Sequence, residues 1–269
     1  MATIISIAGH QGGAGKSSTT MNLGISLARR GHRVLLVDTD PLGAVAAAAG
    51  LPAGTQAGLV QIMKGCAPNQ AIIESSLALP LALLGNGVKQ PTDAFFLEQQ
   101  ARKGGLLPLI RSLAEDYDYV LLDTPSGIEA MSAMAFAASH TLLLVLPCHA
   151  NAVRTLPGLL RLMVRVRKKL NPELHLLGIL ASHFDKQNPY EIDTLAAMRT
   201  TFTQGLFFST IMPRSHQFER AAAHASAIQL LGQTREMNHL YDQLAEEVIN
   251  RLTAGQSAGK NHAQNQTLF

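Results

Sequence analysis

Residues 3–40, TIISIAGHQGGAGKSSTTMNLGISLARRGHRVLLVDTD, contain the pattern that decides the fold. A short run of β-branched and apolar residues ends at Gly9, which is typical of a buried strand. A glycine-rich turn follows, and then apolar residues at helical spacing as far as Gly31, a residue suited to a helix C-terminus. A second apolar run ends in acids at residues 38–40. The stretch therefore predicts a strand–helix–strand unit with parallel strands.

The same alternation continues along the rest of the chain. Further strands are predicted within residues 77–87, 117–127, 140–148, 174–185 and 206–215. Helices are predicted at about residues 95–117 (interrupted near Gly104 and Gly105), 128–138, 155–170, 189–203, 218–231 and 234–252. We expect a single α/β domain over residues 1–252, with a doubly wound, mainly parallel sheet and helices on both faces. Residues 253–269 are polar, and we expect them to form a disordered tail.

The composition is that of an ordinary globular protein, with 47% hydrophobic and 15% charged residues. No run approaches the roughly 18 apolar residues of a membrane span, and the N-terminus lacks the basic region of a signal peptide. Cys66 and Cys148 lie too far apart in sequence for a CxxC pair or a metal spacing. We therefore expect a cytoplasmic protein with reduced thiols and without a membrane partner.

The glycine-rich turn predicts a phosphate-binding site. A strand, a glycine-rich turn and a helix N-terminus together direct backbone N–H groups and the helix dipole at one point. Lys16 would supply a positive charge for the β- and γ-phosphates, and Ser17 a hydroxyl for Mg²⁺. The strict form of the motif would place glycine where His10 stands, and a purely structural turn is the alternative. The predicted nucleotide contacts in the turn are Gln11, Gly12, Gly13, Ala14, Gly15, Lys16, Ser17 and Ser18.

Acidic residues follow two of the predicted strands. Asp40 lies just beyond a strand end beside the predicted phosphate loop, where a carboxylate can orient an attacking water. Asp123 ends a second buried strand and can hold Mg²⁺ through water. The alternative for Asp40 is a strand-end acid that caps the next turn, and Asp123 has a structural alternative as well.

Four segments together resemble the ParA/MinD ATPases, the partition and positioning ATPases of the group that includes nitrogenase iron protein. Residues 9–18 are similar to the family's deviant loop x-K-G-G-x-G-K-[ST]. VLLVDTDP (34–41) resembles its switch I segment, and YDYVLLDTPSGIE (117–129) its Walker B and switch II segment. IMPRSHQFERAAAHASAI (211–228) resembles the stretch that lies near the adenine and the DNA-binding face. The resemblance covers residues 1–252.

The resemblance implies an ATPase with ATP and Mg²⁺ as cofactors. It makes Asp40 the hydrolytic acid, with Lys16 as the other catalytic residue. It puts Asp38 near the metal, beside Ser17 and Asp123, and Pro213 at the nucleotide. It further implies an ATP-dependent homodimer and a ParB-like or other adaptor protein that stimulates hydrolysis.

Gln11 is the main departure from the family's loop. The family's lysine at this position reaches across the dimer to the partner's nucleotide, whereas Gln11 can donate a hydrogen bond but brings no charge. His10 and Arg154 are candidates to replace it. Because some relatives also lack this lysine, the departure does not exclude activity.

Positive charge is concentrated in residues 151–220, which hold ten Lys and Arg against five Asp and Glu. Arg161, Arg165, Lys168 and Lys169 recur at helical spacing, with Leu156, Leu159, Leu160, Met163 and Leu170 towards the other side. Together with Arg199, Arg214 and Arg220, these cations are our candidates for nonspecific DNA contacts. The alternative is a solvated face. The C-terminal tail has no apolar stripe, which argues against membrane binding of the MinD kind.

We therefore expect an ATPase that positions or partitions a cargo, such as a plasmid, a chromosome or a carboxysome-like assembly, on the nucleoid. Two other functions stay open from the sequence. One is a MinD-like regulatory ATPase for flagellar placement or cellulose secretion, in which DNA is irrelevant. The other is a nucleotide-binding adaptor that does not hydrolyse ATP, with Gln11 as the lost catalytic element.

Overall fold

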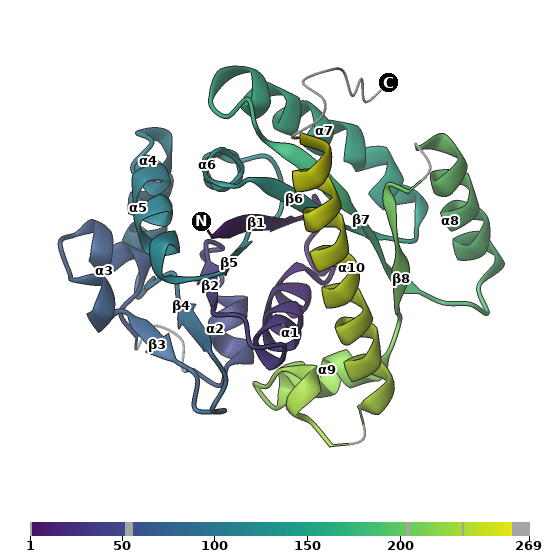
Figure 1. The fold of residues 1–269 in the computed structure, drawn as a ribbon, viewed down its shortest axis with the longest axis horizontal. Coiled ribbons are helices and arrows are strands. Elements are labelled where there is room, and N and C mark those ends of the chain that lie inside the picture. Colours follow the sequence, from purple (N-terminus) through teal and green to yellow (C-terminus); the bar gives the residue numbers. More distant parts are fainter. Residues whose placement is uncertain (1, 52–55, 203–204, 233, 260–269) are drawn as a thin grey trace.

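The computed structural model describes residues 2–51, 56–202, 205–232 and 234–259. Within them, eight strands form one sheet in the order β3-β4-β2-β5-β1-β6-β7-β8 (Figure 1). The strands are β1 (Thr3–Ala8), β2 (Val34–Asp38), β3 (Ile72–Glu74), β4 (Leu81–Leu84), β5 (Tyr119–Asp123), β6 (Thr141–Pro147), β7 (His175–Phe184) and β8 (Phe207–Pro213). Neighbouring strands run parallel except β3, which pairs antiparallel with β4 at one edge. The predicted fold class is confirmed.

Helices cover both faces of the sheet (Figure 1). The α-helices are α1 (Lys16–Arg29), α2 (Ala44–Ala48), α3 (Leu59–Met63), α4 (Pro91–Arg102), α5 (Leu106–Leu113), α6 (Ala130–Ala138), α7 (Ala150–Lys169), α8 (Pro189–Thr201), α9 (His216–Ala223) and α10 (Arg235–Gly259). The described residues also contain three single turns of 3₁₀-helix: η1 (Pro68–Gln70), η2 (Ala114–Asp116) and η3 (Ile228–Leu230). Apolar side chains of α1, α9 and α10 pack on one face, and those of α4–α8 pack on the other.

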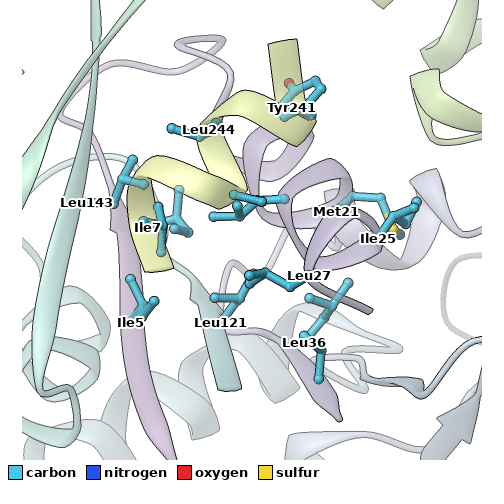
Figure 2. Close-up of a cluster of buried hydrophobic side chains, with 14 of the residues drawn as sticks. Ile5, Ile7, Met21, Ile25, Leu27, Leu36, Leu121, Leu143, Tyr241 and Leu244 are labelled. Atoms are coloured by element: carbon cyan, nitrogen blue, oxygen red, sulfur yellow. The ribbon is translucent and has the colours of Figure 1, made fainter. Parts of the chain in front are cut away.

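The central strands are buried on both sides, which explains why they read as continuous apolar runs. In β1, Ile5 and Ile7 face α1 and α10, whereas Ile4 faces the opposite cluster. Figure 2 shows the first of these clusters, in which side chains of α1 and α10, among them Leu244, meet the strands. Gly24 allows the close approach of α1 to β2, since an added Cβ would lie 2.5 Å from Leu36 Cδ2. This packing fixes the start of α1, and with it the phosphate loop, over the centre of the sheet.

The register of the central strands brings two predicted site residues together. β1 lies between β5 and β6, and β2 pairs with the other side of β5. Asp38 at the end of β2 is the register partner of Asp123 at the end of β5. Parallel strands present their carboxyl ends at one edge, so the loops after β1, β2 and β5 converge there.

The structure corrects several predicted helix boundaries. Helix α7 begins at Ala150 rather than near 155, because the ring of His149 accepts a hydrogen bond from Ala152 N (3.3 Å) and caps the helix before Pro157. The predicted helix 218–231 is divided, because Ala225 adopts a left-handed φ of 47° between α9 and η3. Short elements between residues 41 and 90, including α2, α3 and β3, carry no long periodic pattern and were not predicted.

The last helix is longer than its sequence pattern indicates. Helix α10 continues to Gly259, whereas the predicted helix ends near residue 252 and the predicted tail begins at 253. Residues 260–269 of that tail lie outside the described part of the chain, so its disorder stays an expectation. Among the described residues, no helix has the length and hydrophobicity to span a bilayer.

Candidate functional site

The glycine-rich turn joins β1 to α1 at the carboxyl edge of the sheet. Gly13 and Gly15 have left-handed φ values of 71° and 95°, so glycine is needed at both positions. Gly9 is required for a different reason, because a Cβ there would lie 2.8 Å from the carbonyl oxygen of Val145. Gly12 has neither a left-handed φ nor a close neighbour among the described residues. Only the approach of a ligand argues for glycine there. The turn thus has the open backbone that an anion site needs.

Lys16 extends back across the turn. Its buried ammonium donates hydrogen bonds to the carbonyl oxygen of Gln11 (3.1 Å) and to Ser126 Oγ (2.8 Å). Burial lowers the pKa of Lys16, while the carboxylates of Asp123 and Asp40 oppose that shift. Ser126 follows β5 and was not singled out from the sequence, although it stands in the segment that resembles switch II.

Asp123 connects the phosphate loop to β5. It is fully buried, and its carboxylate accepts hydrogen bonds from Ser17 Oγ (2.6 Å) and Thr20 Oγ1 (3.2 Å). Burial raises the pKa of Asp123 to about 7, against the lowering effect of the Ser17 hydrogen bond and the Lys16 charge. The predicted metal-binding pair Ser17 and Asp123 is therefore brought into direct contact.

Asp38 organises the loop that carries Asp40. Its carboxylate accepts hydrogen bonds from the backbone N–H groups of Asp40 (3.1 Å), Val45 (3.0 Å) and Ala46 (3.4 Å). Burial raises the pKa of Asp38 well above its usual range, and the neighbouring charge of Asp123 adds to the shift. Because both of its oxygens accept hydrogen bonds from the loop backbone, Asp38 holds this loop in place.

Asp40 itself is half-buried at the start of this loop. Its side chain accepts a hydrogen bond from the N–H of Leu42 (3.0 Å), and its carbonyl oxygen accepts one from Asn86 Nδ2 (2.6 Å). The capping role considered from the sequence is thus present, and a second carboxylate oxygen is left for another partner.

The donor set suits Mg²⁺ bound together with a phosphate. Ser17 and Asp123 offer oxygen ligands, which Mg²⁺ prefers. A cation there would also offset the unfavourable negative charge of the two adjacent buried carboxylates, Asp38 and Asp123. In the described ranges, no group of three or more His, Cys, Asp or Glu side chains is placed to hold a metal on its own. Such a site fits a metal that receives its remaining ligands from phosphate and water.

The end of β7 borders the loop on the other side, and the end of β8 lies next to it. Ser182 Oγ donates to the carbonyl oxygen of Ala14 (2.9 Å), and an added Cβ at Gly15 would lie 3.8 Å from His183 Nε2. Half-buried Pro213, the predicted nucleotide contact, pairs in register with Phe184. Pro213 thus ends β8, the strand next to β7, and β7 contacts the phosphate loop.

Arg214 differs from the other predicted DNA contacts. Its guanidinium donates to Glu191 Oε1 (2.5 Å), a carboxylate whose side chain is only 5% exposed. Glu191 also accepts from the backbone N–H of Asp185 (2.7 Å) and from Asn188 Nδ2 (3.2 Å). Arg214 therefore has a structural partner. It joins the start of α8 to the end of β8.

The remaining cations are solvent-exposed, but they do not form one cluster at the site. Exposed positions are occupied by Arg161, Arg165, Lys168 and Lys169 on α7, Arg199 on α8 and Arg220 on α9. The apolar side of α7 is confirmed for Leu156, Leu159 and Met163, which are buried, whereas Leu170 is 50% exposed because the helix ends before it.

Known proteins are similar in sequence to this chain over nearly its whole length. A family model described as an AAA domain matches residues 2–176. The chromosome-partitioning ATPase Soj of Thermus thermophilus is 31% identical over 258 residues, which cover 92% of this chain and 96% of Soj. The chromosome partitioning protein ParA of Caulobacter vibrioides is 29% identical over 259 residues, with 92% and 94% covered.

The fold is also shared with solved structures. The septum site-determining protein MinD from Pyrococcus horikoshii, solved with Mg-ADP, superposes with a TM-score of 0.77 at 20% identity, over 94% of this chain and 98% of MinD. The shared fold agrees with the order of the strands and the position of the glycine-rich turn. From its matched domain and its partitioning relatives, the chain belongs to the AAA-domain family and, within it, to the ParA/MinD group of P-loop ATPases.

Proposed function

We propose that this chain binds and hydrolyses Mg-ATP at the carboxyl edge of β1, β2 and β5. The observation that carries the proposal is the hydrogen bond from Ser17 Oγ to Asp123 Oδ2, 2.6 Å long, directly behind an open glycine-rich turn. It joins a hydroxyl and a buried carboxylate at the point where a phosphate-bound Mg²⁺ would lie. When bound, Mg²⁺ would neutralise charge on the β- and γ-phosphates.

The side chains around the turn have distinct roles in this proposal. Residues 11–18 bind the phosphates through backbone N–H groups, and Lys16 turns its ammonium from Ser126 and the Gln11 carbonyl to the phosphate oxygens. Asp38 holds the following loop in place through its three backbone hydrogen bonds. Asp40 then orients the attacking water with the carboxylate oxygen that Leu42 N leaves open. Pro213 contacts the nucleotide from the end of β8.

We further propose a nucleotide-dependent homodimer that binds DNA nonspecifically and positions a cargo on the nucleoid with a ParB-like or other adaptor. The names of the relatives, which are chromosome-partitioning proteins, support this cellular role. Exposed Arg161, Arg165, Lys168 and Lys169 on α7, with Arg199 and Arg220, support phosphate contacts. Arg214 stays a candidate only through the exposed part of its side chain, since its guanidinium is paired with Glu191.

The test is ATP turnover with and without DNA, using wild type and Asp40→Ala. We expect slow turnover in the wild type and its loss in the variant, while ATP binding persists because Asp40 lies beyond the phosphate loop. DNA mobility shifts that require ATP, do not occur with ADP and weaken steeply with salt would support the positioning role. Turnover that is unaffected by Asp40→Ala contradicts the assigned mechanism.

A MinD-like regulatory ATPase is the second candidate function. Gln11 and the SGIE segment (126–129) leave room for it, because the uncharged Gln11 side chain does not supply the charge with which the family's lysine couples the two subunits. The side-chain amide of Gln11 makes no hydrogen bond with the described residues, and His10 and Arg154 remain the candidates to contact a partner's nucleotide. Absence of DNA binding at low salt, with ATP turnover intact, would select this function.

A further inference from the structure

A groove of about 1360 Å³ lies between α7, α8 and the end of α10, three helices that can be followed in Figure 1. Apolar side chains line it: Leu156, Leu160 and Val164 from α7, Met198 from α8, and Phe202 just after α8. Val164 is 38% exposed even though it is β-branched and apolar. Val164, with half-buried Leu160 and Phe202, thus forms an apolar surface that the described part of the chain leaves partly uncovered.

Positive charge borders this groove. Arg154 and Arg161 line it from exposed positions on α7, and neither forms an ion pair with a described residue. A third cation in the lining, Arg251, is already occupied, since it donates to the carbonyl oxygens of Leu177, Leu206 and Phe207. No Asp or Glu occurs among the lining residues that the structure describes. The groove therefore complements a ligand that is apolar on one side and negatively charged beside it.

The size of the groove fits a short helix. An α-helix 10–12 Å in diameter with a rise of 1.5 Å fills roughly 120–170 Å³ per residue, so this volume accommodates about eight to eleven residues, or two to three turns. Burying the apolar face of such a helix is a common mode of peptide recognition. Phosphate contacts to DNA would use the two arginines but gain nothing from an apolar floor.

We propose that this groove binds an amphipathic helix of a partner protein, with its apolar face on Val164 and its neighbours and its acidic side chains beside Arg154 and Arg161. The inference goes beyond the proposed ATPase and depends on neither hydrolysis nor DNA binding. It adds a protein ligand for Arg161, which is also one of the candidate DNA contacts on α7.

Fluorescence anisotropy with two labelled peptides tests the proposal on the full chain. Both peptides have about 16 residues, long enough to form a helix, and carry leucine along one face. The acidic peptide has glutamate at the flanking positions, and the basic peptide has lysine there. We expect the acidic peptide to bind at least about tenfold more tightly than the basic one. Failure of the acidic peptide to bind at about 1 mM would overturn the proposal.

Matched variants locate the binding surface. Arg161→Glu should weaken binding of the acidic peptide by about tenfold or more, whereas Arg165→Glu, on the same helix but outside the groove, should change it little. Val164→Asp should also abolish binding, with Ile192→Asp, exposed on α8 outside the groove lining, as its control. Thermal unfolding would verify that each variant is folded.

Three other results would contradict this assignment. Equal losses in Arg161→Glu and Arg165→Glu would mean that the peptide follows the net charge of α7 and not the groove. A DNA duplex that displaces the acidic peptide completely would compete for the same surface. If Val164→Asp also weakens DNA binding as much as it weakens peptide binding, DNA is the ligand of the groove. A change in the sedimentation of the peptide-free chain on Val164→Asp would make a second copy the occupant.

Discussion

The ammonium of Lys16 donates a hydrogen bond to Ser126 Oγ over 2.8 Å, although the two residues are 110 positions apart in sequence. This contact joins the phosphate loop to the segment after β5, so Ser126 sets the resting position of the lysine. Because Lys16 gives up this hydrogen bond to reach the phosphates, we predict that Ser126→Ala tightens ATP binding about fivefold, the equivalent of a hydrogen bond worth roughly 1 kcal/mol. ATP titrations of the two proteins measure the effect.

Ser132→Ala is the matched control for this prediction. Ser132 is a buried serine in the following helix, and its hydroxyl donates to the carbonyl oxygen of Pro125 (3.4 Å), away from Lys16. Its removal should change stability rather than ATP affinity. If both alanine variants change ATP affinity equally, Ser126 has no special role in positioning the lysine.

The contrast between Lys16 and Ser126 shows what the sequence could and could not predict. Lys16 lies in a local pattern of strand, glycine-rich turn and helix, which requires no knowledge of the rest of the chain. Ser126 acquires its role only when β5 pairs beside β1, a relationship that no local spacing contains. The same holds for Glu191, whose three hydrogen-bond donors are Asp185 and Asn188 in the loop before α8 and Arg214 just after β8.

The fold follows a similar rule. The central strands were predicted because burial on both faces makes them continuous apolar runs, as in the five buried residues of β2. β3 has three residues at the sheet edge, none of them buried, and it gave no such signal. The break after α9 depends on Ala225 in a left-handed conformation. Alanine rarely adopts this conformation, so the sequence does not predict the break.

Gln11 leaves its position in the phosphate loop uncharged, so adding a positive charge there should change ATP turnover. We expect Gln11→Lys to raise ATP turnover and nucleotide-dependent dimerisation by about tenfold or more, because a fixed positive charge stabilises a transferring phosphoryl group strongly. Gln11→Met has similar length without charge and should not reproduce the gain. Enzyme assays and sedimentation with ATP and ADP measure the two effects. Unchanged values in Gln11→Lys would show that this position does not determine dimer coupling.

The ion pair of Arg214 with Glu191 leads to a prediction that separates stability from DNA binding. Arg214→Ala leaves a carboxylate that is 5% exposed without its charged partner, and should lower the free energy of unfolding by about 1–3 kcal/mol. Arg199→Ala, at an exposed position on α8, should leave stability nearly unchanged and weaken DNA binding more. Urea unfolding and DNA titration at one salt concentration provide the comparison. A larger loss of DNA affinity in Arg214→Ala than in Arg199→Ala would restore Arg214 as a principal DNA contact.

His183 gives a prediction for the dependence of stability on pH. It is half-buried beside Gly15 with a left-handed φ of 53°. Burial lowers its pKa below the ordinary value of 6.5, and the charges of Arg214 and His149 add to the shift while Glu191 opposes it. The unfolded chain therefore takes up a proton first as the pH falls below 6.5, and the free energy of unfolding decreases from there down to the folded-state pKa.

Asparagine at position 183 tests this directly, because it tolerates a left-handed backbone and does not titrate. Urea unfolding without nucleotide should show a shallower loss of stability between pH 7 and the folded-state pKa in His183→Asn than in wild type. At pH 8 the histidine is neutral in both the folded and the unfolded chain, so any difference between the two proteins there reports packing alone. Parallel pH profiles for the two proteins would mean that His183 does not contribute to the acid sensitivity of the fold.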